Sequence, residues 1–299
     1  MDLINSSNSI EPLSPSLVVF LLLDGWGIAQ ASEANIISLA KTPTFLSLIK
    51  EYPVALLEAG EKNINARYLS IGSGYDLSDE NIEPRETLTK ILSENNLTQI
   101  KITETERLAA LTHFFNGHHE NKLKGEDWNI VSSEASDDSH KLSLVSNKII
   151  RESIKAIKSD KYNFILISMP IIDLVASQGN PREIKKAIEI TDKNLKKIVE
   201  AVQSKKGVLI ISSASGNAEN TKSMVTELID KEITNNPVPV IIVGENFKGR
   251  TIGLSEPLNN DLSLLAPAGS LQDLTPTILE IMNLSKPEEM KGESLIDKN

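Results

Sequence analysis

The sequence contains no cysteine. This absence excludes disulfide bonds, thiolate zinc sites and a cysteine nucleophile. Aromatic residues are also scarce, at 4% of the 299 residues, so the core must consist mainly of isoleucine, leucine, valine and alanine. Histidine occurs only four times, at His113, His118, His119 and His140. Few side chains are therefore available as nitrogen ligands for a transition metal.

The sequence also lacks an excess of positive charge and a long apolar run. Its formal net charge of −10 provides neither the basic surface of a general nucleic-acid binder nor attraction to anionic membranes. The apolar run at 17–23 is too short to span a bilayer. It also lacks the basic start and the cleavage site of a secretion signal. We expect a cytoplasmic protein that binds neither nucleic acid nor membrane.

What the sequence does contain is a series of apolar strands alternating with amphipathic helices. The apolar runs predict strands at 17–23, 53–59, 164–170, 208–213 and 238–244, and more weakly at 100–103 and 128–131. Helical spacing and proline positions predict helices at 42–50, 85–94, 147–158, 181–202 and 273–282. This βαβ pattern predicts an α/β fold with a mostly parallel sheet, and the length allows one large domain or two small ones. The polar segment 1–16 is expected to be a disordered tail.

Ligands of such sheets bind beyond the carboxyl ends of the strands. Asp24, Asp173 and the loop SSASGN (212–217) stand at these positions. The loop has small, weakly basic side chains that are poor metal ligands. The sequence therefore predicts the outline of an active site with few groups that can do chemistry.

Several motifs carry a resemblance to a known family: LLLDGWG (21–27), ETERLAALTHFFNG (104–117), GNAE (216–219), NPVP (236–239) and GSLQDLTPTILEIM (269–282). In this order they resemble the cofactor-independent phosphoglycerate mutases of the alkaline phosphatase superfamily. The resemblance implies one α/β domain over 17–297, a three-layer phosphatase-like core with a mostly parallel central sheet between helical layers. It also implies two manganese-type ions held by aspartates and histidines, a serine that carries the phosphoryl group, and an inserted domain that binds phosphoglycerate.

Carried over position by position, the resemblance implies a degenerate site. Asp24 and Asp173 match two metal-binding aspartates and are the candidate metal residues, as vestiges. Other matched positions have lost their chemistry: Ile64 stands at the serine nucleophile, and Ser177, Ala214, Ser215 and Ile233 stand at metal ligands. Since two carboxylates hold a divalent ion weakly, we expect no cofactor. Arg107 stands at the lysine beside the phosphoryl group.

The inserted domain is missing as well. About thirty residues separate IGSG (71–74) from ETER (104–107), too few for a domain with its own core. We expect 76–103 to be a short replacement, a loop and a helix over the former site. Arg85 is its one side chain suited to an acidic substrate.

Each candidate residue also has a plain structural interpretation. Asp24 could cap the next helix, and Asp173 could accept from backbone amides. The histidines are expected at the surface. Arg107, with Asn217 or Asn116 and the serines of 212–217, could bind phosphate, or Arg107 could pair with Glu104 or Glu106.

Three functions remain open. The first is a pseudoenzyme without phosphoryl transfer that acts by binding or regulation, its partner being unknown and conceivably a protein. The second is residual mutase or phosphohydrolase activity at a rearranged metal site. The third is a metal-free sensor of phosphate or a phospho-metabolite, which would use Arg107 and Asn217.

Overall fold

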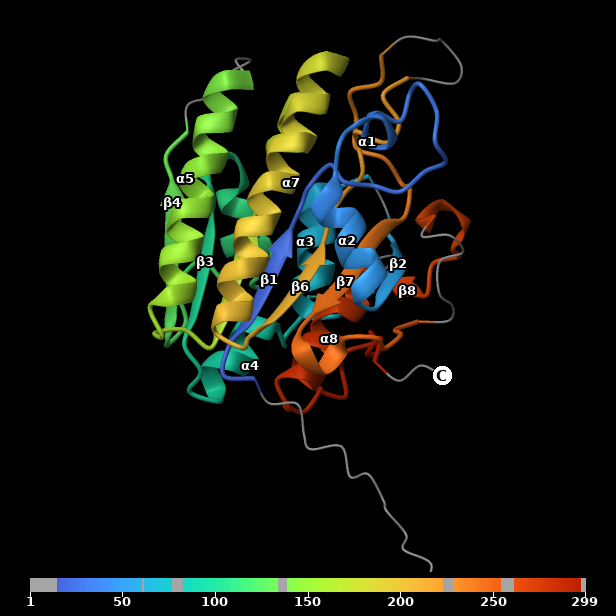
Figure 1. The fold of residues 1–299 in the computed structure, drawn as a ribbon. Coiled ribbons are helices and arrows are strands. Elements are labelled where there is room, and N and C mark those ends of the chain that lie inside the picture. The colour runs from blue at the N-terminus through green and yellow to red at the C-terminus, as the bar shows by residue number, and fades with distance from the viewer. Residues whose placement is uncertain are drawn as a thin grey trace, which may run out of the picture.

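The computed structural model describes residues 15–60, 62–76, 83–133, 139–222, 229–253 and 261–296, without the side chains of residues 139 and 140. Its centre is an eight-stranded sheet of order β4-β3-β5-β1-β6-β7-β2-β8 (Figure 1). The strands are β1 (Val18–Leu22), β2 (Val54–Glu58), β3 (Gln99–Glu104), β4 (Glu126–Val131), β5 (Phe164–Ser168), β6 (Val208–Ser212), β7 (Val238–Val243) and β8 (Gly269–Ser270).

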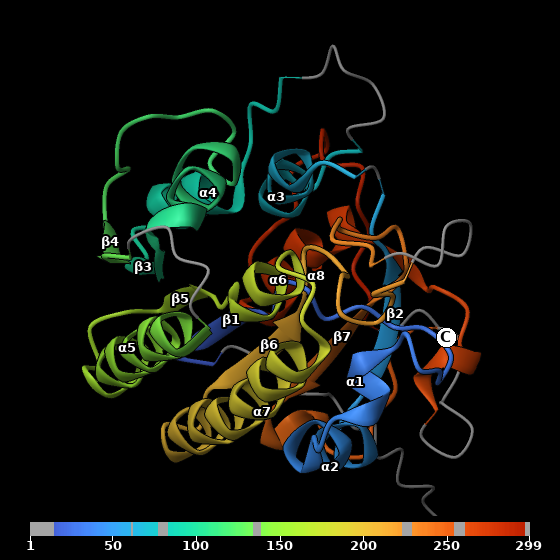
Figure 2. The same cartoon turned by 90° about the horizontal axis from the view of Figure 1, so that it is seen from above.

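Helices cover both faces of the sheet, as the view from above shows (Figure 2). One layer contains α2 (Pro43–Glu51), α5 (Ser139–Lys158) and α7 (Pro181–Ser204), with the short α1 (Ile36–Leu39) and α6 (Ile171–Ala176). The other contains α3 (Ile64–Ser73), α4 (Leu88–Glu94) and α8 (Leu274–Ile281). The chain thus forms the three-layer α/β architecture that the sequence predicted.

The strands β1 and β7 are apolar at every position, and β5 and β6 are apolar except for their final serine, because both faces of these strands are buried. In β1, Val19 and Leu21 pack with the layer of α7, whereas Phe20 packs with the layer of α3 and α8. The same alternation divides the neighbouring strands between two hydrophobic clusters. Continuous hydrophobic runs are typical of such doubly covered strands.

The sheet is parallel except around β7. β1 pairs in parallel with β5 and β6, and β3 pairs in parallel with β4 and β5. β7 is antiparallel to both its neighbours, β6 and β2. The carboxyl ends of β1, β5 and β6 therefore meet at one edge.

The segment 76–103 differs from the expected loop and helix over the site. Its residues 77–82 lie outside the described part of the chain. α4 packs on the face of the sheet, where Leu88 and Leu92 join the core cluster that contains Phe164 and Leu166. Residues 99–103 belong to β3. The helix therefore completes the second layer and does not cover the carboxyl ends of the strands.

Most of the expected tail, residues 1–14, also lies outside the described residues. Within those residues, no helix is both long enough and apolar enough to cross a bilayer.

Candidate functional site

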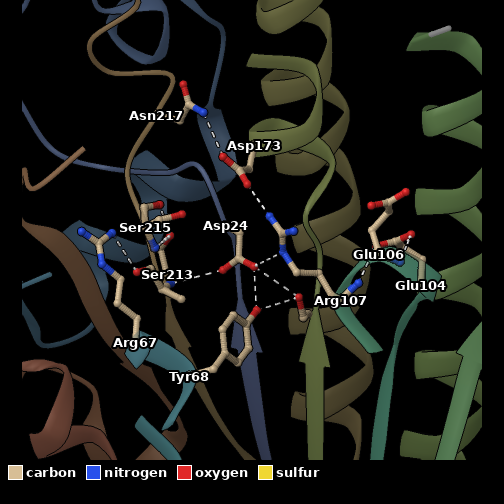
Figure 3. Close-up of polar contacts among 12 residues, drawn as sticks. Asp24, Arg67, Tyr68, Glu104, Glu106, Arg107, Asp173, Ser213, Ser215 and Asn217 are labelled. Carbon is tan, nitrogen blue, oxygen red and sulfur yellow. Dashed lines mark hydrogen bonds and ion pairs between the residues drawn. The ribbon is translucent and has the colours of Figure 1, made fainter. Parts of the chain in front are cut away.

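Asp24 forms the centre of a polar cluster at the carboxyl ends of the strands (Figure 3). It follows β1 by two residues and its side chain is completely buried. Its Oδ2 accepts from Tyr68 Oη at 2.6 Å and lies 3.4 Å from Ser168 Oγ. Its Oδ1 accepts from the Ala214 amide at 3.2 Å. Asp24 therefore accepts from a backbone amide across the sheet edge, and the expectation that it caps the next helix is wrong.

Gly25 lets Asp24 approach Asp173 closely. Gly25 has φ +93°, and a Cβ atom there would lie 2.5 Å from the Asp173 amide nitrogen. That amide donates to the carbonyl oxygen of Asp24 at 3.1 Å. The Asp-Gly pair is thus required by a backbone contact as well as by the turn.

Asp173 lies in the first turn of α6, three residues after Pro170. Its Oδ1 accepts from Asn217 Nδ2 at 2.9 Å, and its Oδ2 accepts from Arg107 Nη2. The expectation that it binds backbone amides is therefore wrong. Burial raises the pKa of Asp173, more than the Arg107 guanidinium and the Asn217 amide lower it.

Arg107 joins the two aspartates. It ends a 3₁₀ turn, Thr105–Arg107, that follows β3 directly. Its Nε lies 3.3 Å from Asp24 Oδ2, and its Nη2 pairs with Asp173 Oδ2. The side chain is only 11% exposed. Burial opposes the charge, but Asp24 and Asp173 outweigh it and raise the pKa of the guanidinium above its ordinary value.

Glu104 holds the backbone of the turn that carries Arg107. Its carboxylate accepts from the amides of Glu106, at 2.9 Å, and Arg107, at 3.1 Å, and from the Ser133 hydroxyl. The predicted ion pair between the Arg107 side chain and Glu104 or Glu106 is therefore replaced by pairing with Asp24 and Asp173. Glu104 acts on Arg107 through the backbone.

Tyr68 places a phenol against Asp24 and was not identified from the sequence. It lies on α3, completely buried, with its hydroxyl 2.9 Å from Ser168 Oγ. Burial and the neighbouring Asp24 carboxylate raise the pKa of Tyr68 well above its ordinary value. The phenol is therefore a permanent hydrogen-bond donor to Asp24. The available signal for its helix was Asn63, which accepts from the Asn65 and Ala66 amides as the N-cap.

The loop 212–217 closes the cluster on its other side. Ser213 Oγ donates to the carbonyl of Ser215 at 2.6 Å, which finishes the turn. Arg67 of α3, also unidentified from the sequence, donates to the carbonyls of Ala214, at 3.3 Å, and Thr234, at 2.9 Å. Buried oxygens without a hydrogen-bond partner also occur here: Ser212 Oγ, Ser215 Oγ and Asn217 Oδ1.

The two candidate phosphate-binding residues are brought together, but around a carboxylate. Arg107 and Asn217 donate to opposite oxygens of Asp173. An anion would have to displace Asp173 to receive these donors. Asn116, the other candidate partner, binds Glu126 with its amide at 3.1 Å and belongs to a different cluster.

These residues do not fit a pair of divalent ions. Within the described part of the chain, no three His, Asp or Glu side chains are grouped so that they could hold a metal. Ile64, which matches the position of the serine nucleophile, is the first residue of α3 and has no oxygen in its side chain. Ser177 Oγ donates to the Leu174 carbonyl at 2.8 Å, and Ile233 has no ligand atom. The hydrogen-bond donors that surround the carboxylates of Asp24 and Asp173 are groups of the protein itself.

The described histidines lie away from this cluster. His118 and His119 are exposed and His113 is half-buried, with the His113 and His118 rings 5.2 Å apart. The side chain of His140 lies outside the described residues.

A second buried charge cluster was not identified from the sequence. Lys101 Nζ on β3 lies 3.0 Å from Glu126 Oε1 on β4 and contacts Asn116 Oδ1. Trp128 Nε1 donates to Glu126 at 2.6 Å. Burial lowers the pKa of Lys101 to about 8, although Glu126 opposes this shift. The cluster joins β3 to β4.

Comparison with known proteins accounts for the shared motifs. Residues 16–286 match the model of the Metalloenzyme superfamily. The 2,3-bisphosphoglycerate-independent phosphoglycerate mutase of Ehrlichia canis is 37% identical over 71% of this chain and 40% of its own length. The Vibrio parahaemolyticus enzyme is 34% identical over 69% of this chain and 38% of its own length. The chain thus spans about 40% of the length of these relatives.

Solved structures show the same fold at low sequence identity. The phosphoglycerate mutase of Leishmania mexicana superposes with a TM-score of 0.81 at 13% identity, over 95% of this chain and 98% of that chain. The alkaline phosphatase of the Antarctic bacterium TAB5 superposes with a TM-score of 0.58 at 14% identity, over 92% of this chain and 100% of that chain. The chain therefore belongs to the alkaline phosphatase-like Metalloenzyme superfamily and is a homologue of the cofactor-independent phosphoglycerate mutases.

Proposed function

We propose that this domain does not transfer phosphoryl groups and instead acts by binding or regulation. The observation that carries the proposal is the state of Asp24. Its carboxylate accepts from Tyr68, Arg107 and the Ala214 amide, which together occupy both oxygens. Oδ2 accepts from two strong donors and Oδ1 from one, so most of the roughly four lone-pair sites of this carboxylate are already used by the protein itself.

The neighbouring positions support the same proposal. Phosphoryl transfer through a covalent intermediate needs a nucleophile and cations that stabilise the charge of the transition state. Ile64 provides no nucleophilic atom. The guanidinium of Arg107 is neutralised by Asp24 and Asp173 and cannot stabilise a phosphoryl group without leaving them.

The test is turnover of phosphoglycerate and of a phosphomonoester by the purified chain in Mn²⁺ buffer, with Asp24→Ala measured beside it. We expect no turnover above buffer for either protein. Metal-dependent turnover that Asp24→Ala abolishes would overturn the proposal and support residual mutase or phosphohydrolase activity.

Thermal melting with phosphate or phosphoglycerate separates the sensor hypothesis. A ligand that binds only the folded state raises the melting temperature. Because Arg107 and Asn217 already donate to Asp173, we expect no shift in the melting temperature. A concentration-dependent rise that is lost in Asn217→Ala would favour the sensor instead.

A further inference from the structure

The buried charges of Asp24, Asp173 and Arg107 indicate more than the loss of an active site. Asp24 and Asp173 are two carboxylates with 0% and 11% of their side chains exposed. Their main chains are tied together by the hydrogen bond from the Asp173 amide to the Asp24 carbonyl. Two buried carboxylates this close stay ionised together only with a cation beside them, because otherwise one of them takes up a proton.

Arg107 provides that cation from within the chain. Its Nε faces Asp24 Oδ2 and its Nη2 faces Asp173 Oδ2, so one guanidinium spans both carboxylates (Figure 3). The guanidinium is planar and presents its donors in a fixed fork that suits carboxylate oxygens. The turn that carries it is fixed by Glu104 through two backbone amides.

We infer that Arg107 closes a latent cation site between Asp24 and Asp173, acting as an internal substitute for a soluble cation. The inference rests on the proposed function and adds that the Arg107 guanidinium is the group that blocks the site. Removal of the guanidinium leaves two carboxylates held in place by Gly25, Tyr68, Asn217 and the Ala214 amide. At a pH at which both carboxylates are ionised, that pair then binds a cation from solution.

The experiment compares Arg107→Ala with the unaltered chain by thermal melting and calorimetry, using Mn²⁺ and, separately, millimolar guanidinium chloride as probes. We expect no cation-dependent shift in the unaltered chain. In Arg107→Ala we expect a rise in melting temperature of about 5 °C at a hundredfold excess over the Kd. Arg151→Ala is the matched control, because Arg151 is 73% exposed and pairs only with Glu152 among the described ion pairs.

Two further variants locate the effect. Arg107→Ala/Asp173→Asn keeps one carboxylate and should lose most of the cation-dependent shift. Arg107→Lys restores an internal charge and should reduce the shift.

If Arg107→Ala folds only when the cation is present, that dependence supports the inference directly. Arg107→Gln, which keeps amide donors but no charge, repeats the test in a milder background.

The outcomes separate this inference from the proposed function. Mn²⁺ binding by the unaltered chain, abolished in Asp24→Ala, would overturn the inference even without turnover. Absence of a cation effect in both Arg107→Ala and Arg107→Gln would overturn it too. Neither result bears on whether the chain transfers phosphoryl groups, which the turnover assay decides.

Discussion

At the scale of single residues, the hydrogen bond from Tyr68 to Asp24 should be a large contribution to stability. Its length is 2.6 Å, its acceptor is a buried carboxylate, and hydrogen bonds to charged groups contribute about 1.5–3 kcal/mol. Tyr68→Phe should lower the free energy of unfolding by about 2 kcal/mol. Ser168→Ala, whose hydroxyl lies 3.4 Å from the same oxygen, should cost less. Urea denaturation of both variants checks this, and equal losses would contradict it.

The pair of Lys101 and Glu126 should show the asymmetry typical of buried ion pairs. Lys101→Met leaves Glu126 buried without its cation, and breaking such a pair costs about 3–5 kcal/mol. Lys101→Met/Glu126→Gln removes both charges and should be clearly more stable than the single variant. Denaturation curves for the two variants measure the difference. A double variant no better than the single one would show that the charges are not the cause.

The same pair predicts a dependence of stability on pH. The pKa of Lys101 is lowered from 10.5 to about 8 in the folded chain. Between these values the unfolded chain binds more protons, so the Lys101 contribution to stability rises with pH across this window. Below pH 8 both states are protonated and the slope vanishes. The difference in melting temperature between the unaltered chain and Lys101→Met/Glu126→Gln, measured from about pH 7.5 to about pH 10.5, should show this rise.

The sequence allowed the residues of the site to be named, but not their partners. Asp24, Asp173 and Arg107 follow from strand ends and from motifs. That Arg107 pairs with the aspartates, and not with Glu104 nearby in sequence, depends on the sheet order, which places the end of β3 one strand away from the end of β1, with β5 between them. Such a contact between distant segments has no local signature. Tyr68 was missed for the same reason.

At the scale of elements, Gly72 fixes how closely α3 approaches the π-helical turn Ala110–Phe114. A Cβ atom at Gly72 would lie 2.1 Å from the Phe115 carbonyl oxygen. Helix propensity alone would make Gly72→Ala stabilising by about 1 kcal/mol. We expect destabilisation, because a backbone oxygen cannot yield to the new atom. Asn65→Ala, in the first turn of the same helix, controls for propensity, and thermal melting of both variants decides the sign.

Elements with an apolar run, a clear helical period or a proline near the start were predictable, whereas α3 and α6 were not. The strands β1, β5 and β6 and the helix α7 follow from unbroken apolar runs and helical spacing. α3 lacks a clear apolar period, and α6 has only six residues. The direction of β7 was also not predictable, because an apolar strand has the same pattern in either direction.

At the scale of the whole molecule, stability should not depend on bound metal. The positive charge between Asp24 and Asp173 is part of the chain. Exhaustive treatment with a chelator should therefore leave the melting temperature of the unaltered chain within about 1 °C, whereas loss of a tightly bound ion lowers it by several degrees. Arg107→Ala loaded with Mn²⁺ serves as the comparison that should respond. A drop in the unaltered chain would show a metal contribution.

The central position of β1 also affects how the chain folds during synthesis. β1 pairs with β5 and β6, which follow it by about 150 and about 190 residues. At a synthesis rate of about 5–20 residues per second, β1 waits about 10–40 s for its second neighbour. A fully apolar strand without partners is prone to aggregate in that interval. We therefore expect the chain to depend on a chaperone most strongly during synthesis, while β1 has no partner strand.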